Sequence, residues 1–198
     1  DIERQGETTS TVVLGEDANS VYATDVVINP GVKTPMWMKR VLYHAGIRPS
    51  DNIEDVSKYV LLMTGAITYI TDRTSEYKLD GRKLNDIDLF EATALQTTNN
   101  EATFVTVGSD KRANFVNEKN LDKIFGARSI KGTNTEAAEL TSKLALQIAM
   151  KAGFISSAAT TVSEVKLNDR EFVIEDSYVF GYLGTELNID EIAVKLSK

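Results

Sequence analysis

The sequence contains no cysteine and only one histidine, His44, in 198 residues. Without cysteine the chain can form no disulfide, no thiolate nucleophile and no cysteine-ligated zinc site. With a single imidazole, a two-histidine metal site is excluded and a catalytic triad would depend on His44 alone. His44 lies near the end of a predicted helix, where a cationic ring complements the helix dipole. We therefore expect no catalytic residues of these kinds, no metal site and no cofactor.

Long hydrophobic runs are also missing. The longest, residues 59–63, is much shorter than the roughly 20 residues that a helix needs to cross a bilayer. Residues 1–10 are polar and lack the basic and apolar regions of a signal peptide. The sequence therefore predicts a soluble protein with no membrane partner. It assigns no location, although a virion is one option.

The composition is that of a folded protein, with 42% hydrophobic and 26% charged residues. A chain of this length can bury about 70% of its unfolded surface, enough for a core without disulfides or metals. Residues 1–19 are polar and predict a mobile or partner-binding arm, followed by one domain at 20–198. The formal net charge of -7 argues against broad attraction to nucleic acid or anionic lipid.

The order of elements predicts an α+β fold: a single compact domain with a helical middle, short β-hairpins and an extended N-terminal arm. β-Branched runs and turn residues predict strands at 21–28 and 102–107 and hairpins at 77–84 and 162–175. Capping residues and apolar periodicity predict helices at 35–45, about 50–63, 117–125, 133–153 and 189–196. A further helix is expected after Asn85, with Asp86 and Asp88 in its first turn.

Two short motifs carry weak chemical signals. The glycine-bounded segment 126–133 resembles a phosphate-binding loop, but its lysine precedes the last glycine, whereas a Walker A loop has them in the opposite order. An ordinary capped loop is the favoured interpretation. Asp86, Asp88 and Glu91 form an acidic cluster that suits either a metal site or a carboxylate pair. With 29 acidic residues in the chain, a solvated helix face is the simpler explanation.

Two basic segments stand out against the acidic average. The segment 33–48 has four basic residues and no acidic one, and 110–131 has six basic and three acidic residues. If the segments meet in space, they form a groove for a phosphodiester backbone, with Trp37 and Tyr43 available to stack on bases. The alternative is two solvated faces, with the aromatic rings in the core. The candidate nucleic-acid-binding residues are Lys33, Lys39, Arg40, Arg48, Lys111, Arg112, Lys119, Lys123, Arg128 and Lys131.

The extended arm and the missing catalytic constellation favour a structural or assembly subunit. We expect a homo-oligomer, such as a viral or phage coat, nucleocapsid or tail component, because an arm can add a strand to a neighbouring sheet. One alternative is a protein that binds single-stranded nucleic acid through the basic groove. Another is an enzyme that uses carboxylates, lysines or tyrosines on an unknown substrate. The sequence favours a non-enzyme without deciding the question.

Overall fold

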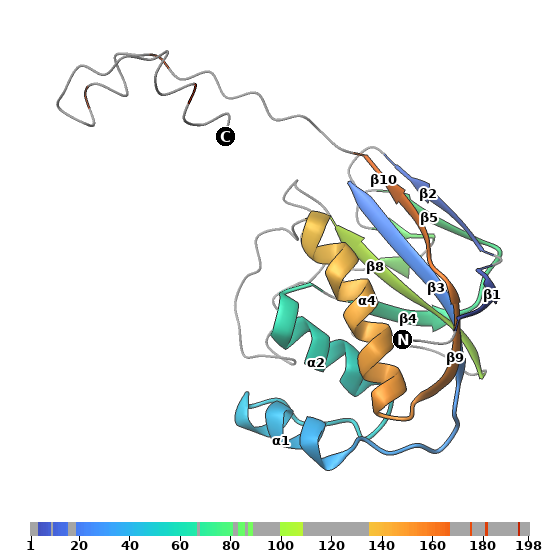
Figure 1. Cartoon of the computed structure of the whole chain (residues 1–198), viewed down its shortest axis with the longest axis vertical. Coiled ribbons are helices and arrows are strands. Elements are labelled where there is room, and N and C mark those ends of the chain that lie inside the picture. The colour runs from blue at the N-terminus through green and yellow to red at the C-terminus, as the bar shows by residue number, and fades with distance from the viewer. Residues whose placement is uncertain are drawn as a thin grey trace. The chain divides into compact units, whose positions relative to one another are not determined.

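The computed structural model describes residues 4–8, 10–15, 19–66, 68–80, 83–85, 87–88, 100–108 and 135–166, together with 175, 181 and 194. Contacts within the chain group residues 1–167 into one compact unit and 168–198 into a second. All helices and strands with assigned bounds lie in the first unit. The expected α+β class is confirmed, since mixed sheets and helices pack together in this unit (Figure 1).

A large mixed sheet, sheet A, forms the centre of the unit. Its strands follow the order β1, β9, β3, β8, β4, and β10 also pairs with β3. The central strand, β3, covers the expected β-branched run and has β8 antiparallel along its whole length. The bounds are β1 Arg4–Glu7, β3 Ser20–Ile28, β4 Thr68–Asp72, β8 Glu101–Gly108, β9 Ile155–Thr160 and β10 Val162–Val165.

A smaller sheet, sheet B, has the order β2, β5, β6, β7. Its strands are β2 Thr11–Leu14, β5 Glu76–Asp80, β6 Lys83–Leu84 and β7 Ile87–Asp88. The antiparallel pairing of Asp80 with Lys83 confirms the expected hairpin. The helix expected after Asn85 is wrong: Asn85 has a φ of 54° and leads into β7. Asparagine tolerates this left-handed conformation, so it serves a tight turn between strands instead of a cap.

Helices cover one face of sheet A, and sheet B packs near the other (Figure 1). The helices are α1 Met36–His44, α2 Glu54–Thr64 and α4 Thr135–Lys151. The main core lies between them and sheet A and includes Met38, Val60, Phe104 and Phe154. A second core, which includes Leu14, Val21, Tyr69 and Tyr77, lies on the opposite side of the sheet.

Helix α4 follows the expected span, but its buried face is not the expected one. The spacing predicts that Leu140, Leu144 and Ile148 face the core, yet Leu140 is 61% exposed. The fully buried positions are instead small residues, including Ala138, Ala145 and Ala149. Small side chains allow the helix axis to approach the sheet closely, and among the large apolar residues of α4 it is Leu146, 4% exposed, that enters the main core.

Residues 4–14 join the two sheets. Strand β1 runs parallel to β9 in sheet A, and β2 runs parallel to β5 in sheet B. Between these strands, the hydroxyl of Thr8 donates to the carbonyl of Thr160 at 2.5 Å, and that of Ser10 donates to the carbonyl of Thr74 at 2.5 Å. The segment that the sequence assigned to an arm is therefore paired with the chain's own sheets where the structure describes it.

Several expected elements lie outside the described residues: the helix at 117–125, the helix at 189–196 apart from residue 194, the loop at 126–133, the second half of the hairpin at 162–175 apart from residue 175, and Asp86 and Glu91 of the acidic cluster. Strand β10, the first half of that hairpin, pairs antiparallel with β3. Among the described helices, none is long and apolar enough to cross a bilayer.

Candidate functional site

Helix α1 and the loops at its two ends carry four of the ten residues expected to bind nucleic acid. The helix starts after Pro35, whose φ of -66° suits a helix start, and no side chain caps it. Thr34, a residue type that often caps helices, instead donates its hydroxyl to a carboxylate on α2. The loop after the helix turns at Gly46, whose φ of 77° is the left-handed conformation that favours glycine.

A buried carboxylate, Asp55, holds α1 and α2 together. Its oxygens accept hydrogen bonds from the Thr34 hydroxyl at 2.5 Å and from the backbone N–H groups of Ser50 at 2.7 Å and Asp51 at 3.0 Å. The ammonium group of Lys58 lies 3.4 Å from the same carboxylate. Asp55 itself is 0% exposed. These donors replace its lost hydration and fix the segments before α1 and α2 relative to each other.

A second carboxylate, that of Asp51, forms ion pairs with two of the candidate lysines. Its oxygens lie 2.7 Å from the ammonium group of Lys39 and 3.9 Å from that of Lys33. The hydrogen bond from Lys39 holds the pKa of Asp51 below its usual value. Asp51 also accepts the backbone N–H of Thr34 at 3.1 Å. Two of the four basic residues in this segment are therefore partly neutralised.

The other two basic residues, Arg40 and Arg48, are exposed, and neither forms an ion pair with the part of the chain that the structure describes. On α1, Met36, Arg40 and Tyr43 follow one another at intervals of four and three residues, so they share one face of the helix. Met36 is 64% and Tyr43 is 63% exposed. We call these three residues the outer face of α1.

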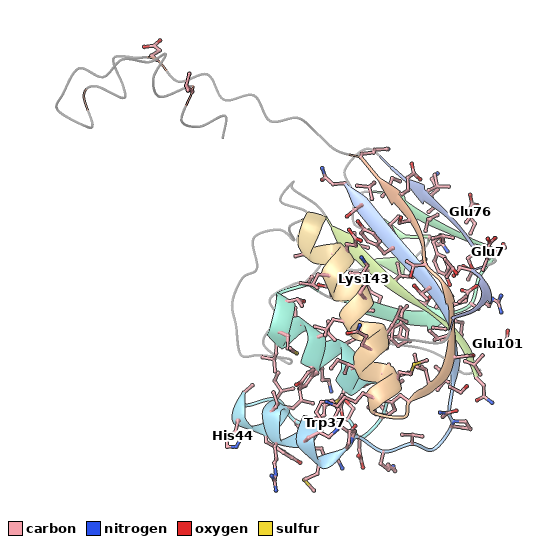
Figure 2. All side chains as sticks on the ribbon, in the orientation of Figure 1. Glu7, Trp37, His44, Glu76, Glu101 and Lys143 are labelled. Carbon is pink, nitrogen blue, oxygen red and sulfur yellow. The ribbon has the colours of Figure 1, made fainter. Side chains whose placement is uncertain are left out.

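Trp37 belongs to the packing between helices. Its ring meets that of Tyr59 on α2 edge to face, with centroids 5.4 Å apart. The ammonium group of Lys151, at the end of α4, lies 5.2 Å from the centre of the Trp37 ring. Figure 2 shows Trp37 near the meeting point of the three helices and His44 projecting outward from α1. For Trp37 the alternative interpretation, a place in the core, is the one that the structure supports.

The other six candidates, Lys111, Arg112, Lys119, Lys123, Arg128 and Lys131, lie outside the described residues. Whether the two basic segments meet in space therefore stays a prediction. Among the residues that the structure describes, no group of three histidine, cysteine, aspartate or glutamate side chains is placed to hold a metal ion.

A polar cluster on sheet A was missed by the sequence analysis. Asp25, in the middle of β3, is 5% exposed, and its carboxylate accepts the hydroxyl of Thr103 at 2.6 Å. The guanidinium of Arg73 lies 3.2 Å from Asp25 and 3.5 Å from Glu101. The one available signal was an acidic residue inside the β-branched run of 20–28. Because the described partners of Asp25 are donors that balance its charge, the cluster stabilises the sheet and the start of the chain beside it.

A layer of hydroxyl groups lies on the helix-facing side of sheet A. The hydroxyls of Thr24 and Thr161 lie 2.7 Å apart, and those of Thr68 and Thr106 lie 2.8 Å apart. Close by on β3, burial and the charge of Glu139 raise the pKa of Tyr22 above its usual value. Hydroxyls that pair with each other in this way satisfy the hydrogen-bonding groups that burial removes from water.

No protein-family model matches the chain. Segments of it are similar to the phenylalanine–tRNA ligase beta subunit. The match to the protein of Lactobacillus johnsonii has 44% identity over 55 residues, 27% of this chain and 7% of that protein. For Streptococcus pyogenes serotype M18 the identity is 40% over 76 residues, 36% of this chain and 9% of that protein. For Streptococcus thermophilus it is 43% over 56 residues, 28% of this chain and 7% of that protein. The matches therefore span less than a tenth of the length of these relatives.

These similarities correct the functional expectation. A structural or assembly role as a viral or phage coat, nucleocapsid, capsid or tail component is wrong, because the relatives are tRNA ligase subunits. A virion location has no support for the same reason. A beta subunit is, by its name, one component of a larger assembly. Over 27–36% of its length, the chain is similar to a segment of the phenylalanine–tRNA ligase beta subunit.

Proposed function

We propose that this chain is a module related to the phenylalanine–tRNA ligase beta subunit and that its partner is tRNA. The observation that carries the proposal is the identity of 40–44% over segments of 55–76 residues. The role is therefore tied to tRNA charging, within a ligase assembly or beside one.

The described surface is compatible with an RNA partner. The chain carries a net charge of -7, yet no acidic residue occurs between Val26 and Ser50, a segment that includes all of α1. RNA binding needs a local concentration of positive charge, which an acidic protein can provide only where its acidic residues are absent.

Binding of a labelled tRNA-Phe transcript to the full chain tests the proposal directly. We expect saturable binding that unlabelled tRNA-Phe competes for better than an RNA hairpin of equal length. The affinity should fall steeply with salt, because bound phosphates release counterions. Absence of tRNA binding at low salt would overturn the proposal.

Replacement of a segment provides a second test that does not depend on affinity. The matching segment of the Lactobacillus johnsonii beta subunit is exchanged for the corresponding segment of this chain, and charging of tRNA-Phe is measured. A related module should leave charging within about tenfold of the parent ligase, a loss of about 1.4 kcal/mol. An unrelated sequence of equal length is the control, and equal failure of both chimaeras would count against the proposed relationship.

A partner copy of the same chain is a separate prediction. The sequence led us to expect a homo-oligomer, and light scattering over a concentration series tests it. A mass above 21.8 kDa that rises with concentration is the expected result. A constant monomer mass would remove self-association and leave tRNA as the proposed partner.

A further inference from the structure

The charge on the outer face of α1 is not balanced by a neighbouring acid in the way that the charge of Lys143 on α4 is. On α4, the exposed Lys143 is paired with Glu139 one turn earlier, with a distance of 2.5 Å between the charged atoms. On α1, Arg40 has no acidic partner among the residues that the structure describes. Asp51 is the first acidic residue after α1 in the sequence, and it already forms ion pairs with Lys39 and Lys33. The charge of Arg40 is therefore available to an external anion.

An exposed aromatic ring accompanies this charge. Tyr43 lies three residues after Arg40, on the same face of the helix, and 63% of its surface is exposed. Trp37, the other ring on α1, is used in packing against Tyr59. An exposed tyrosine beside an exposed arginine that pairs with no acid in the described part of the chain suits a nucleotide, because the ring can stack on a base while the guanidinium binds a phosphate.

The buried side of α1 gives this surface a rigid support. Met38 and Leu42 are 0% exposed and anchor the helix in the main core. The Asp55 carboxylate fixes Thr34, just before the helix, to the start of α2. Arg40 and Tyr43 therefore project from an element whose position is set before any ligand arrives, which lowers the entropic cost of binding.

We propose that the outer face of α1, with Arg48 in the loop after it, contacts unpaired nucleotides of tRNA: Arg40 and Arg48 bind phosphates, and Tyr43 stacks on a base. This inference rests on the proposed function. A stacking ring requires a base that is free of the duplex, so the contact is with a loop or with the single-stranded end. The occupant is RNA rather than another protein because the exposed charges on this face are cationic and match a phosphate backbone.

The test uses the full chain and anisotropy of labelled tRNA-Phe, of a single-stranded 12-mer RNA and of a blunt RNA duplex. Tyr43→Ala should weaken binding of tRNA and of the 12-mer by roughly 5- to 100-fold, the range for one lost stacking contact. Tyr43→Phe should bind like the parent. Arg40→Ala should make the plot of log affinity against log salt less steep by about one unit, the contribution of one phosphate contact. Lys143→Ala is the matched control and should leave both quantities unchanged.

The outcomes separate the two proposals. If the parent chain binds tRNA but Tyr43→Ala and Arg40→Ala bind it equally well, the α1 contact is wrong and the proposed function stands. If the parent chain binds no tRNA, both fail. If the two variants lose a ligase subunit while their tRNA affinity is unchanged, the face is a protein interface and the RNA contact is refuted. Because Arg40 and Tyr43 are exposed, circular dichroism should show all variants folded.

Discussion

Removal of the Asp55 carboxylate should destabilise the chain more than any other single truncation in the α1–α2 region. In Asp55→Ala the backbone N–H groups of Ser50 and Asp51 lose their acceptor, and the Thr34 hydroxyl keeps only its longer hydrogen bond, 3.3 Å, to a backbone carbonyl. Each hydrogen bond to a charged group contributes about 1.5–3 kcal/mol, but the contributions are not additive, since water can reach part of the space. We expect a loss of about 3–5 kcal/mol, the range for breaking a buried charged interaction.

Urea unfolding followed by tryptophan fluorescence measures this loss. Trp37 is the only tryptophan, and its contact with Tyr59 joins α1 to α2, so its emission reports on the affected region. Glu54→Ala, one residue earlier, is the control and should cost at most about 1 kcal/mol, because it removes only a charge from the first turn of the helix. A loss below about 1 kcal/mol for Asp55→Ala, with an unchanged m-value, would refute the role assigned to this carboxylate.

Three further predictions concern charged and buried groups. Arg73→Met should cost about 2 kcal/mol in urea unfolding, a value between those of exposed and buried pairs, because Arg73 is partly exposed beside the buried Asp25; a neutral effect would contradict the role of the cluster. The lowered pKa of Asp51 means that its stabilisation is present above the pKa of the unfolded chain and is lost as pH falls through the folded pKa. Asp51→Asn, which tolerates the φ of 62°, should therefore lose less stability than the parent between pH 7 and pH 2, and parallel curves would count against this. Burial raises the pKa of Tyr69, so stability should fall as pH rises above about 10, where the unfolded chain ionises, and Tyr69→Phe should flatten this fall; an unchanged alkaline fall would argue that other groups cause it.

Local signals predicted the elements whose sequence and burial agree. The β-branched run at 21–28 is almost coextensive with β3, and the helix after Pro35 ends before Gly46 as its punctuation predicts. The hairpin between β5 and β6 also follows from local turn chemistry. In these cases the residues that determine the element lie within it, so no knowledge of distant partners is needed.

The predictions that differ from the structure concern residues whose roles depend on contacts with distant parts of the sequence. Thr34 has the chemistry of a helix cap, but the nearby carboxylate of Asp55 competes for its hydroxyl. Leu140 has the spacing of a core residue, yet the sheet selects the face of α4 with small side chains. Strand β1 is too polar to be recognised as a strand, and its partner in sheet A lies about 150 positions later in the chain.

The candidate site could be predicted only in part. Sequence alone identified the basic segment around α1, because charge is visible without a fold. It could not show that Asp51 forms ion pairs with Lys33 and Lys39 while Arg40 stays exposed, because these contacts depend on the path of the loop before α2. It also could not separate Tyr43 from Trp37, because exposure of an aromatic ring is a property of the packed helices.

The parallel pairing of β1 with β9 has a consequence for synthesis of the chain. Arg4 pairs with Ala158, so the first strand leaves the ribosome long before its partner exists. Until then this edge of sheet A cannot form, and β1 stays unpaired and open to aggregation or chaperones. Pairings of such high contact order are slow to form. The β1–β9 edge of sheet A should therefore close late, after β9 has emerged, whereas the pairing of β3, β8 and β4 does not depend on it.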